Sequence, residues 1–137
     1  MATFTSDSPA ETEALGRRFG NDLTTGAVLA LQGDLGTGKT QFTKGLVAGV
    51  GSNAEVTSPT FTILHEYGGG KLSVYHFDFV RLKDATRLAQ IGFDDYLFGN
   101  GICVIEWADL FADLIPEDAR WIRFELKSAE QRLIHVE

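Results

Sequence analysis

The sequence predicts an α/β fold in three layers, with a mostly parallel sheet, an antiparallel β-hairpin and flanking helices. Short apolar runs typical of buried strands, at residues 27–32 and 101–106, alternate with segments of helical periodicity. Two segments rich in β-branched and aromatic residues, 61–67 and 72–79, are separated by three consecutive glycines, a pattern typical of a hairpin. The length of 137 residues predicts one domain that spans residues 1–137.

The first predicted helix follows a polar N-terminal segment. Ser8 and Glu11 form a capping-box pattern, and Pro9 occupies the first helical position, where its missing N–H costs nothing. We expect this helix to run to about Phe19 and to end at Gly20, because glycine is the commonest residue after a helix.

The remaining elements follow in order. Residues 41–50 repeat apolar side chains at helical spacing, and residues 84–91 begin with an aspartate that can cap a short helix. Pro116 ends a short helical stretch after the strand at 101–106. Weak alternation predicts two late strands, 121–126 and 133–136.

Composition narrows the classes of function. The formal net charge is −7, and an acidic chain repels phosphate backbones, so a role on nucleic acid is expected to run through a partner. Cys103 is the only cysteine, which excludes an intrachain disulfide. No apolar run approaches the roughly 18 residues of a membrane span, and the N-terminus lacks a signal pattern. These features favour the cytoplasm.

The strongest motif lies between the strand at 27–32 and the helix that follows it. It fits the Walker A pattern G-x-x-x-x-G-K-[ST], whose loop N–H groups surround the phosphates of a nucleotide. Lys39 is expected to reach the β- and γ-phosphates, and the Thr40 hydroxyl to bind Mg²⁺. The helix that starts near Lys39 adds its positive dipole end. The nucleotide-binding residues predicted from this motif are Gly33, Asp34, Leu35, Gly36, Thr37, Gly38, Lys39, Thr40 and Gln41.

A Walker A loop needs a second acid for the metal, at the end of a neighbouring buried strand. Glu106 ends the strand at 101–106 and is the candidate for that acid, so Thr40 and Glu106 are the predicted metal ligands. The alternation of a strand places His76 and Asp78 on one face, where Asp78 can approach the γ-phosphate, although an exposed polar edge explains the same pattern. Cys103 is interpreted as a buried reduced thiol.

Other functions share the same loop. A small kinase would also need an arginine-bearing lid, and the chain has no clustered segment of that kind. A GTPase would need a guanine-reading Asn-Lys-x-Asp run, which does not occur. A binding module that uses the nucleotide as a switch remains an alternative. A metal site from His65, His76 and Cys103 has no supporting ligand spacing.

The order of motifs between Ser8 and Pro116 resembles the TsaE (YjeE) family, the ATPase of bacterial tRNA threonylcarbamoyladenosine synthesis. Apart from the loop at residues 33–40, no single motif is specific for the family. Five motifs in this order are specific for it. The other matching pieces are Ser58-Pro59-Thr60-Phe61, His76-Phe77-Asp78 with Arg81, Gly92-Phe93-Asp94-Asp95-Tyr96 and Ile105-Glu106-Trp107.

The resemblance implies an ATP- and Mg²⁺-dependent ATPase that is slow alone and acts with a TsaB–TsaD pair, so that tRNA is contacted at most through the complex. Lys39 and Thr40 would hold phosphate and Mg²⁺, and Glu106 would be the Walker B acid. Asp78 would be required for hydrolysis, so the implied catalytic residues are Asp78, Glu106 and Lys39.

Three further expectations come from the same resemblance. Trp107 would lie near the nucleotide or a partner surface, residues 58–60 would form a switch-like loop, and the segment around Ser8 would approach the adenine. The chain departs from the family pattern at Val80, where the family has tyrosine, and the part beyond Pro116 shows no clear match.

Overall fold

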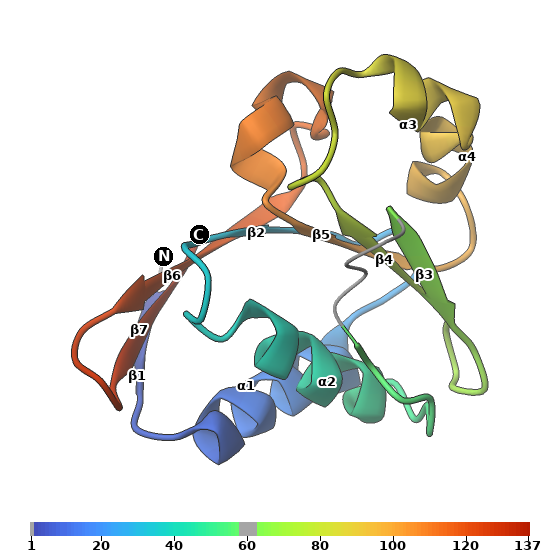
Figure 1. Cartoon of the computed structure of the whole chain (residues 1–137). Coiled ribbons are helices and arrows are strands. Elements are labelled where there is room, and N and C mark those ends of the chain that lie inside the picture. Colours follow the sequence, from blue (N-terminus) through green and yellow to red (C-terminus); the bar gives the residue numbers. More distant parts are fainter. Residues whose placement is uncertain (1, 58–62) are drawn as a thin grey trace.

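A computed structural model describes residues 2–57 and 63–137 of the chain (Figure 1). One seven-stranded sheet runs through it, in the order β1-β7-β6-β2-β5-β4-β3. The strands are β1 (Ala2–Ser6), β2 (Val28–Gln32), β3 (Leu64–Tyr67), β4 (Val74–Asp78), β5 (Ile102–Glu106), β6 (Arg120–Leu126) and β7 (Arg132–Val136). The helices are α1 (Pro9–Asp22), α2 (Lys39–Gly49), α3 (Thr86–Gln90), α4 (Phe93–Leu97) and the 3₁₀ helix η1 (Ala108–Leu114).

The sheet has a parallel centre and antiparallel flanks. Strand β2 pairs in parallel with β5 and β6, and β5 pairs in parallel with β4. Antiparallel β3 extends one side, while β7 and then β1 extend the other. Figure 1 shows α1 and α2 on one face and η1, α3 and α4 on the other. The predicted three-layer α/β class is therefore confirmed.

Each face of the sheet has its own apolar core, as a three-layer architecture requires. On one face, Phe42 and Leu46 of α2 pack with Leu29 and Leu31 of β2. On the other face the core contains Phe77, Phe79, Leu88, Phe93 and Ile105. Strand β5 has no exposed residue because it contributes to both cores, which explains its uninterrupted apolar run.

The first helix begins as its sequence predicts and ends later. The Ser8 hydroxyl accepts the Glu11 N–H at 3.1 Å, which is the expected N-cap bond. The helix then continues through Gly20 to Asp22, so the prediction that Gly20 stops it is wrong. Gly20 is buried against α2, where a Cβ atom would stand 2.3 Å from the Leu46 carbonyl oxygen. Its lack of a side chain serves the packing of two helices.

Several other elements agree with their sequence signals. The glycine-linked hairpin forms from β3 and β4, and both late strands are present as β6 and β7. The second helix starts at Lys39, as expected from the motif. The short helix at 84–91 is observed as Thr86–Gln90, but its N-cap is Ala85 and not Asp84, whose Oδ1 instead accepts the Thr86 N–H at 2.9 Å just before the helix.

Two elements were missed, and one alternative is wrong. Strand β1 and the short helix α4 have no counterpart among the elements expected from the sequence. The interpretation of His76 and Asp78 as an exposed edge fails, because β4 lies inside the sheet between β5 and β3. Both side chains are buried, with 0% and 4% of their surfaces exposed.

Candidate nucleotide-binding site

Three parallel strands end at the same edge of the sheet. Leu31 of β2 pairs with Glu106 of β5, and Glu106 pairs with Asp78 of β4. The glycine loop leaves β2 directly above this edge and leads into α2. Polar side chains at the carboxyl ends of adjacent parallel strands meet at one point, which is where open α/β sheets bind their ligands.

The loop at residues 33–40 is held in a conformation that favours glycine. Gly38, the N-cap of α2, has φ +106, a left-handed angle that a residue with a Cβ rarely adopts. The Thr37 hydroxyl donates to the Asp34 carbonyl at 2.6 Å, and Arg132 Nε donates to the Gly36 carbonyl at 3.2 Å. The loop is thus braced from within and from strand β7.

Lys39 lies at the centre of the site. Its ammonium donates to the carbonyl oxygens of Gly33 and Asp34 and lies 3.8 Å from the ring centroid of Trp107. Burial lowers the pKa of Lys39, while the nearby carboxylates of Glu106 and Asp78 act in the opposite direction. A partly desolvated cation at a helix N-terminus is a strong binding group for phosphate.

Glu106 faces the first turn of α2. Its Oε1 lies 3.5 Å from the Thr40 hydroxyl, and its Oε2 lies 2.5 Å from His76 Nε2. A hydroxyl and a carboxylate oxygen are ligands that suit Mg²⁺, which keeps waters and substrate phosphates in its other positions. Glu106 is the acid of this pair, and no group of three or more His, Cys, Asp or Glu that could hold a metal occurs in the described ranges. The pair fits a metal that arrives with its nucleotide.

Asp78 supplies a second carboxylate beside Glu106. Its Oδ1 accepts the Val80 N–H at 2.9 Å, which fixes the side chain at the end of β4. Burial raises the pKa of Asp78, the Val80 hydrogen bond lowers it, and the charge of Glu106 raises it. A buried carboxyl whose pKa is raised by burial is a better proton acceptor than an ordinary aspartate.

These groups line a cavity of about 1140 Å³. Its walls include most of the predicted site residues: Ser8, Leu35, Gly36, Gly38, Lys39, Thr40, Gln41, Asp78 and Glu106. Gly33, Asp34 and Thr37 do not line it and instead shape the loop through the contacts described above. The volume is ample for a nucleotide, since ligand cavities commonly measure about 300–1000 Å³.

One wall of the cavity was missed by sequence reasoning. Ala129, Glu130 and Arg132, from β7 and the turn before it, line this wall. Asp7, Pro9 and Thr12 complete that side next to Ser8. No local pattern marks these residues, because they reach the loop only through the pairing of β7 with β6 and β1.

The other residues that the sequence analysis singled out differ in where they lie relative to the cavity. Trp107 borders the cavity and has φ +59, a left-handed angle that is uncommon outside glycine and often occurs at functional sites. The Gln41 amide donates to Glu13 at 2.8 Å, which joins α2 to α1 beside the cavity. Val80 and Arg81 line the cavity near Asp78. The expected switch loop at 58–60 lies outside the described residues.

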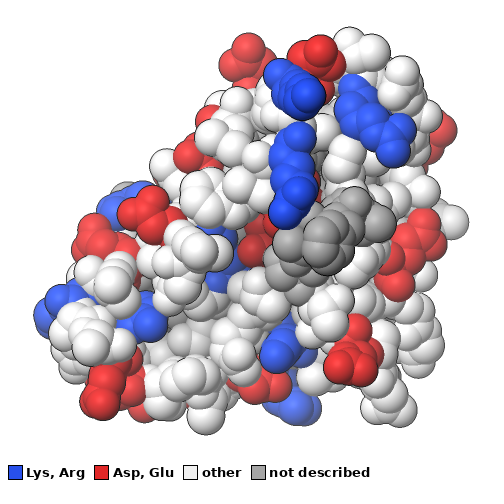
Figure 2. All heavy atoms as spheres, viewed as in Figure 1, with Lys and Arg blue, Asp and Glu red and all other residues white. Residues whose placement is uncertain are grey.

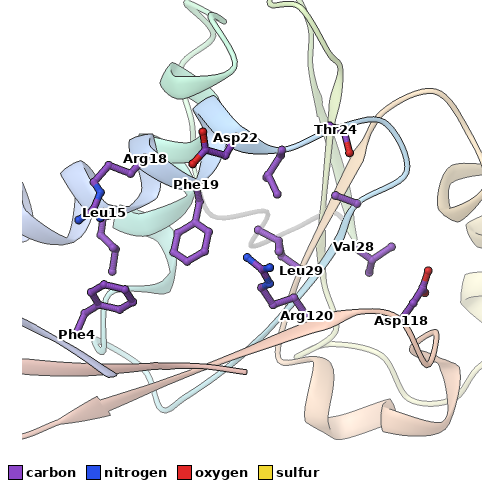
Figure 3. Close-up of a pocket in the computed structure, with 12 residues that line it drawn as sticks. Phe4, Leu15, Arg18, Phe19, Asp22, Thr24, Val28, Leu29, Asp118 and Arg120 are labelled. Atoms are coloured by element: carbon purple, nitrogen blue, oxygen red, sulfur yellow. The ribbon is translucent and has the colours of Figure 1, made fainter. Parts of the chain in front are cut away.

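A second cavity, of about 600 Å³, opens at the other end of β2 (Figure 3). Phe19 from α1 faces Arg120 from β6 there, and the guanidinium carbon lies 5.9 Å from the ring centroid. Val28 and Leu29 at the start of β2 line it, whereas the glycine loop follows the end of the same strand. It contains none of the predicted site residues.

The structure agrees with the expectation that Cys103 is a buried thiol. Cys103 is buried in the core that contains Phe77, and burial raises the pKa of its thiol to about 12, so it is a poor nucleophile. Figure 2 shows both acidic and basic side chains on one face of the molecule, with several Lys and Arg side chains close together in the upper part of the view. Within the described residues, no helix combines the length and apolarity that crossing a bilayer needs.

Comparison with known proteins identifies the family. The family model of the threonylcarbamoyl adenosine biosynthesis protein TsaE matches residues 6–134. The chain belongs to the TsaE family. A TsaE protein of Bacillus subtilis is 40% identical over 127 residues, which cover 93% of this chain and 79% of that protein. The TsaE protein of Treponema pallidum is 44% identical over 112 residues, which cover 82% of each chain.

A solved structure supports the same conclusion. The crystal structure of Bacillus subtilis YdiB aligns with a TM-score of 0.85 and 35% identity, covering 98% of this chain and 83% of that one. The TsaE match also extends past Pro116, so the expectation that the C-terminal part shows no clear family match is corrected. Strand β7 and the turn before it, which supply the missed wall of the cavity, lie in that part. TsaE membership places the chain in the biosynthesis of threonylcarbamoyladenosine in tRNA.

Proposed function

We propose that this TsaE protein binds ATP with Mg²⁺ over the loop at residues 33–40 and hydrolyses it. The hydrolysis would serve the protein complex that forms threonylcarbamoyladenosine in tRNA, in the cytoplasm. The observation that carries the proposal is the convergence of Lys39, Thr40 and Glu106 at the carboxyl edge of the parallel strands. We treat residues 1–137 as one functional domain.

The phosphates would lie against the first turn of α2. Loop N–H groups and the Lys39 ammonium would bind the β- and γ-phosphates, and the Thr40 hydroxyl with Glu106 would hold Mg²⁺. The metal supplies charge neutralisation between the phosphates when it is bound. The lysine leaves its contacts with the Gly33 and Asp34 carbonyls to reach the phosphates.

Asp78 is our candidate for the group that positions the attacking water. Both oxygens of Glu106 already face polar groups, Thr40 and His76, whereas Asp78 uses Oδ1 for the Val80 N–H and lines the cavity. Its Oδ2 can therefore accept a hydrogen bond from water that attacks the γ-phosphate in line. Lys39 and the loop N–H groups would stabilise the negative charge on the transferring group.

ATP turnover of the purified chain tests the proposal. We expect slow hydrolysis that rises when a TsaB–TsaD pair is added, and a loss of about 100-fold or more in Lys39→Ala, because a charged donor to the transition state is removed. Lys44→Ala is the matched control, since Lys44 lies on the exposed side of the same helix. Hydrolysis that does not respond to the pair would contradict the partner assignment.

The alternatives predict different products. A small kinase would transfer the γ-phosphate to an acceptor instead of releasing inorganic phosphate. A nucleotide-dependent switch would bind ATP and show no turnover even with the TsaB–TsaD pair present. Measuring released phosphate against ADP separates the three functions, because only hydrolysis gives equal amounts of both.

A further inference from the structure

A diagonal of buried polar side chains crosses three neighbouring strands beneath the site. It consists of Glu106 on β5, His76 on β4 and Tyr67 on β3, with 3%, 0% and 5% of their surfaces exposed. His76 pairs with Val104 and His65, so Glu106 and Tyr67 are each two residues away from its direct partners. Diagonal neighbours of this kind lie within reach of long side chains.

Hydrogen bonds connect the three residues in series. His76 Nε2 lies 2.5 Å from Glu106 Oε2, and His76 Nδ1 lies 3.1 Å from the Tyr67 hydroxyl. The same hydroxyl lies 3.1 Å from the Thr57 carbonyl and 3.4 Å from His65 Nδ1. The His76 imidazole is therefore held at both nitrogens, which leaves its ring no freedom to turn without breaking a buried hydrogen bond.

In this arrangement the two carboxylate oxygens of Glu106 contact different groups. Oε2 is taken by His76, and Oε1 is turned toward the Thr40 hydroxyl at 3.5 Å. A glutamate without that anchor can rotate about its last torsion and can also approach the Lys39 ammonium, whose pKa already reflects the nearby charge of Glu106. The anchor keeps one oxygen available beside Thr40.

We propose that His76 is a positioning residue for Glu106, and that Tyr67 fixes the His76 ring so that Oε1 is presented beside Thr40 as a ligand for Mg²⁺. This inference rests on the proposed function, because it assigns the two residues to the same metal. Groups that hydrogen-bond to a metal ligand orient it, and their loss commonly costs about 10–100-fold in metal affinity or activity.

A purely structural role makes a different prediction. Buried polar groups in a core need partners whatever the function, and their loss lowers stability without regard to the ligand. A positioning role lowers the contribution of Mg²⁺ to nucleotide binding and leaves metal-free binding unchanged. The ratio of the two affinities therefore separates the roles.

The test is a calorimetric titration with adenylyl imidodiphosphate, once in excess Mg²⁺ and once in EDTA. We expect Tyr67→Phe and His76→Asn to lower the gain in affinity due to Mg²⁺ about tenfold, with the affinity in EDTA unchanged. His76→Gln should recover part of the loss, because its longer amide can donate at the place of Nε2. Tyr75→Phe is the matched control, since it removes a hydroxyl from the same strand in the opposite core.

Each outcome bears on the proposal. If Mg²⁺ increases nucleotide affinity by the same factor in the wild type, Tyr67→Phe and His76→Asn, the positioning role is overturned. The proposed ATPase function is not affected by that result. An equal loss in His76→Gln and His76→Asn would overturn the donor role of position 76. No gain from Mg²⁺ in the wild type would refute the metal-dependent function itself. If His76→Asn fails to fold, Tyr67→Phe decides alone, because phenylalanine keeps the ring that packs in this core.

Discussion

Asp78 shows how a single residue in this site sets its proposed function against stability. Its carboxylate is 4% exposed, and burial raises its pKa because the charged form loses hydration. A raised pKa in the folded state means that the folded chain binds the proton more tightly than the unfolded chain does. The ionised group therefore lowers the free energy of unfolding at every pH above the ordinary carboxyl value of 3.8, and that cost fades as the pH falls.

We predict that Asp78→Asn raises the melting temperature at pH 7 by a few degrees and lowers ATP turnover by about 100-fold or more. Asparagine keeps an oxygen for the Val80 N–H and carries no charge to bury. Thermal unfolding measured from pH 7 toward pH 4 checks the sign, because the difference between variant and wild type should shrink as the pH falls. A lower melting temperature for the variant at pH 7 would mean that the carboxylate is net stabilising.

Residues differ in how far their roles could be anticipated from the sequence. The positions of Lys39 and Thr40 beside the cavity were predictable because their motif is local, and its spacing indicates the chemistry that we propose for them. His76 was correctly placed on the face of Asp78 by strand alternation, but its bond to Glu106 depends on which strand lies next to β4. Arg132 reaches Gly36 from 96 positions away, and no local signal marks such a contact.

At the scale of elements, the packing of α1 against α2 depends on glycines in both helices. A Cβ atom on Gly45 would stand 1.8 Å from the Glu13 carbonyl oxygen, and one on Gly16 would stand 2.0 Å from the Phe42 carbonyl oxygen. Gly20 and Gly49 meet the opposite backbone in the same way. The two helices therefore touch backbone to backbone, which brings the N-terminus of α1 beside the glycine loop.

We predict that Gly45→Ala lowers the free energy of unfolding by about 3 kcal/mol, since backbone atoms cannot move aside as a flexible side chain can. Helix propensity alone predicts the opposite, a gain of about 1 kcal/mol from replacing glycine within a helix. The clash is the larger effect because the helices would have to separate. Denaturant unfolding of the variant measures the difference directly.

Gly68→Ala is the control for this prediction. A Cβ atom there meets nothing within 4 Å, so we expect a change within about 0.5 kcal/mol. Stabilisation of the protein by Gly45→Ala would show that the helices are farther apart than described. The same close contact explains why Gly20 was misread from the sequence, because a glycine that ends a helix and one that lets two helices touch look identical in a single chain.

At the scale of the whole molecule, the site is a consequence of strand order. The class of fold was predictable, because alternating strand and helix signals favour a parallel sheet with helices on its faces. The order β1-β7-β6-β2-β5-β4-β3 was not, since it depends on pairings between segments far apart in the chain. Strand β1 pairs with β7 across almost the entire sequence, and its short polar run carries no strand signal that stands out locally.

Because the site depends on the order of the strands, nucleotide binding should affect the stability of the whole molecule. The proposed site includes the β1–α1 connection, the start of α1, the loop after β2, the ends of β4 and β5, and β7. A bound nucleotide would therefore connect elements that lie on both flanks of β2 in the sheet. A ligand that binds only the folded state stabilises it by about 2.7 kcal/mol at 100 times its dissociation constant. We therefore expect ATP with Mg²⁺ to raise the melting temperature by several degrees, and Lys39→Ala to abolish most of that rise. If Lys39→Ala responded to ATP as the wild type does, the nucleotide would have to bind elsewhere, and the second cavity, beside Phe19 and Arg120, would be the first place to test.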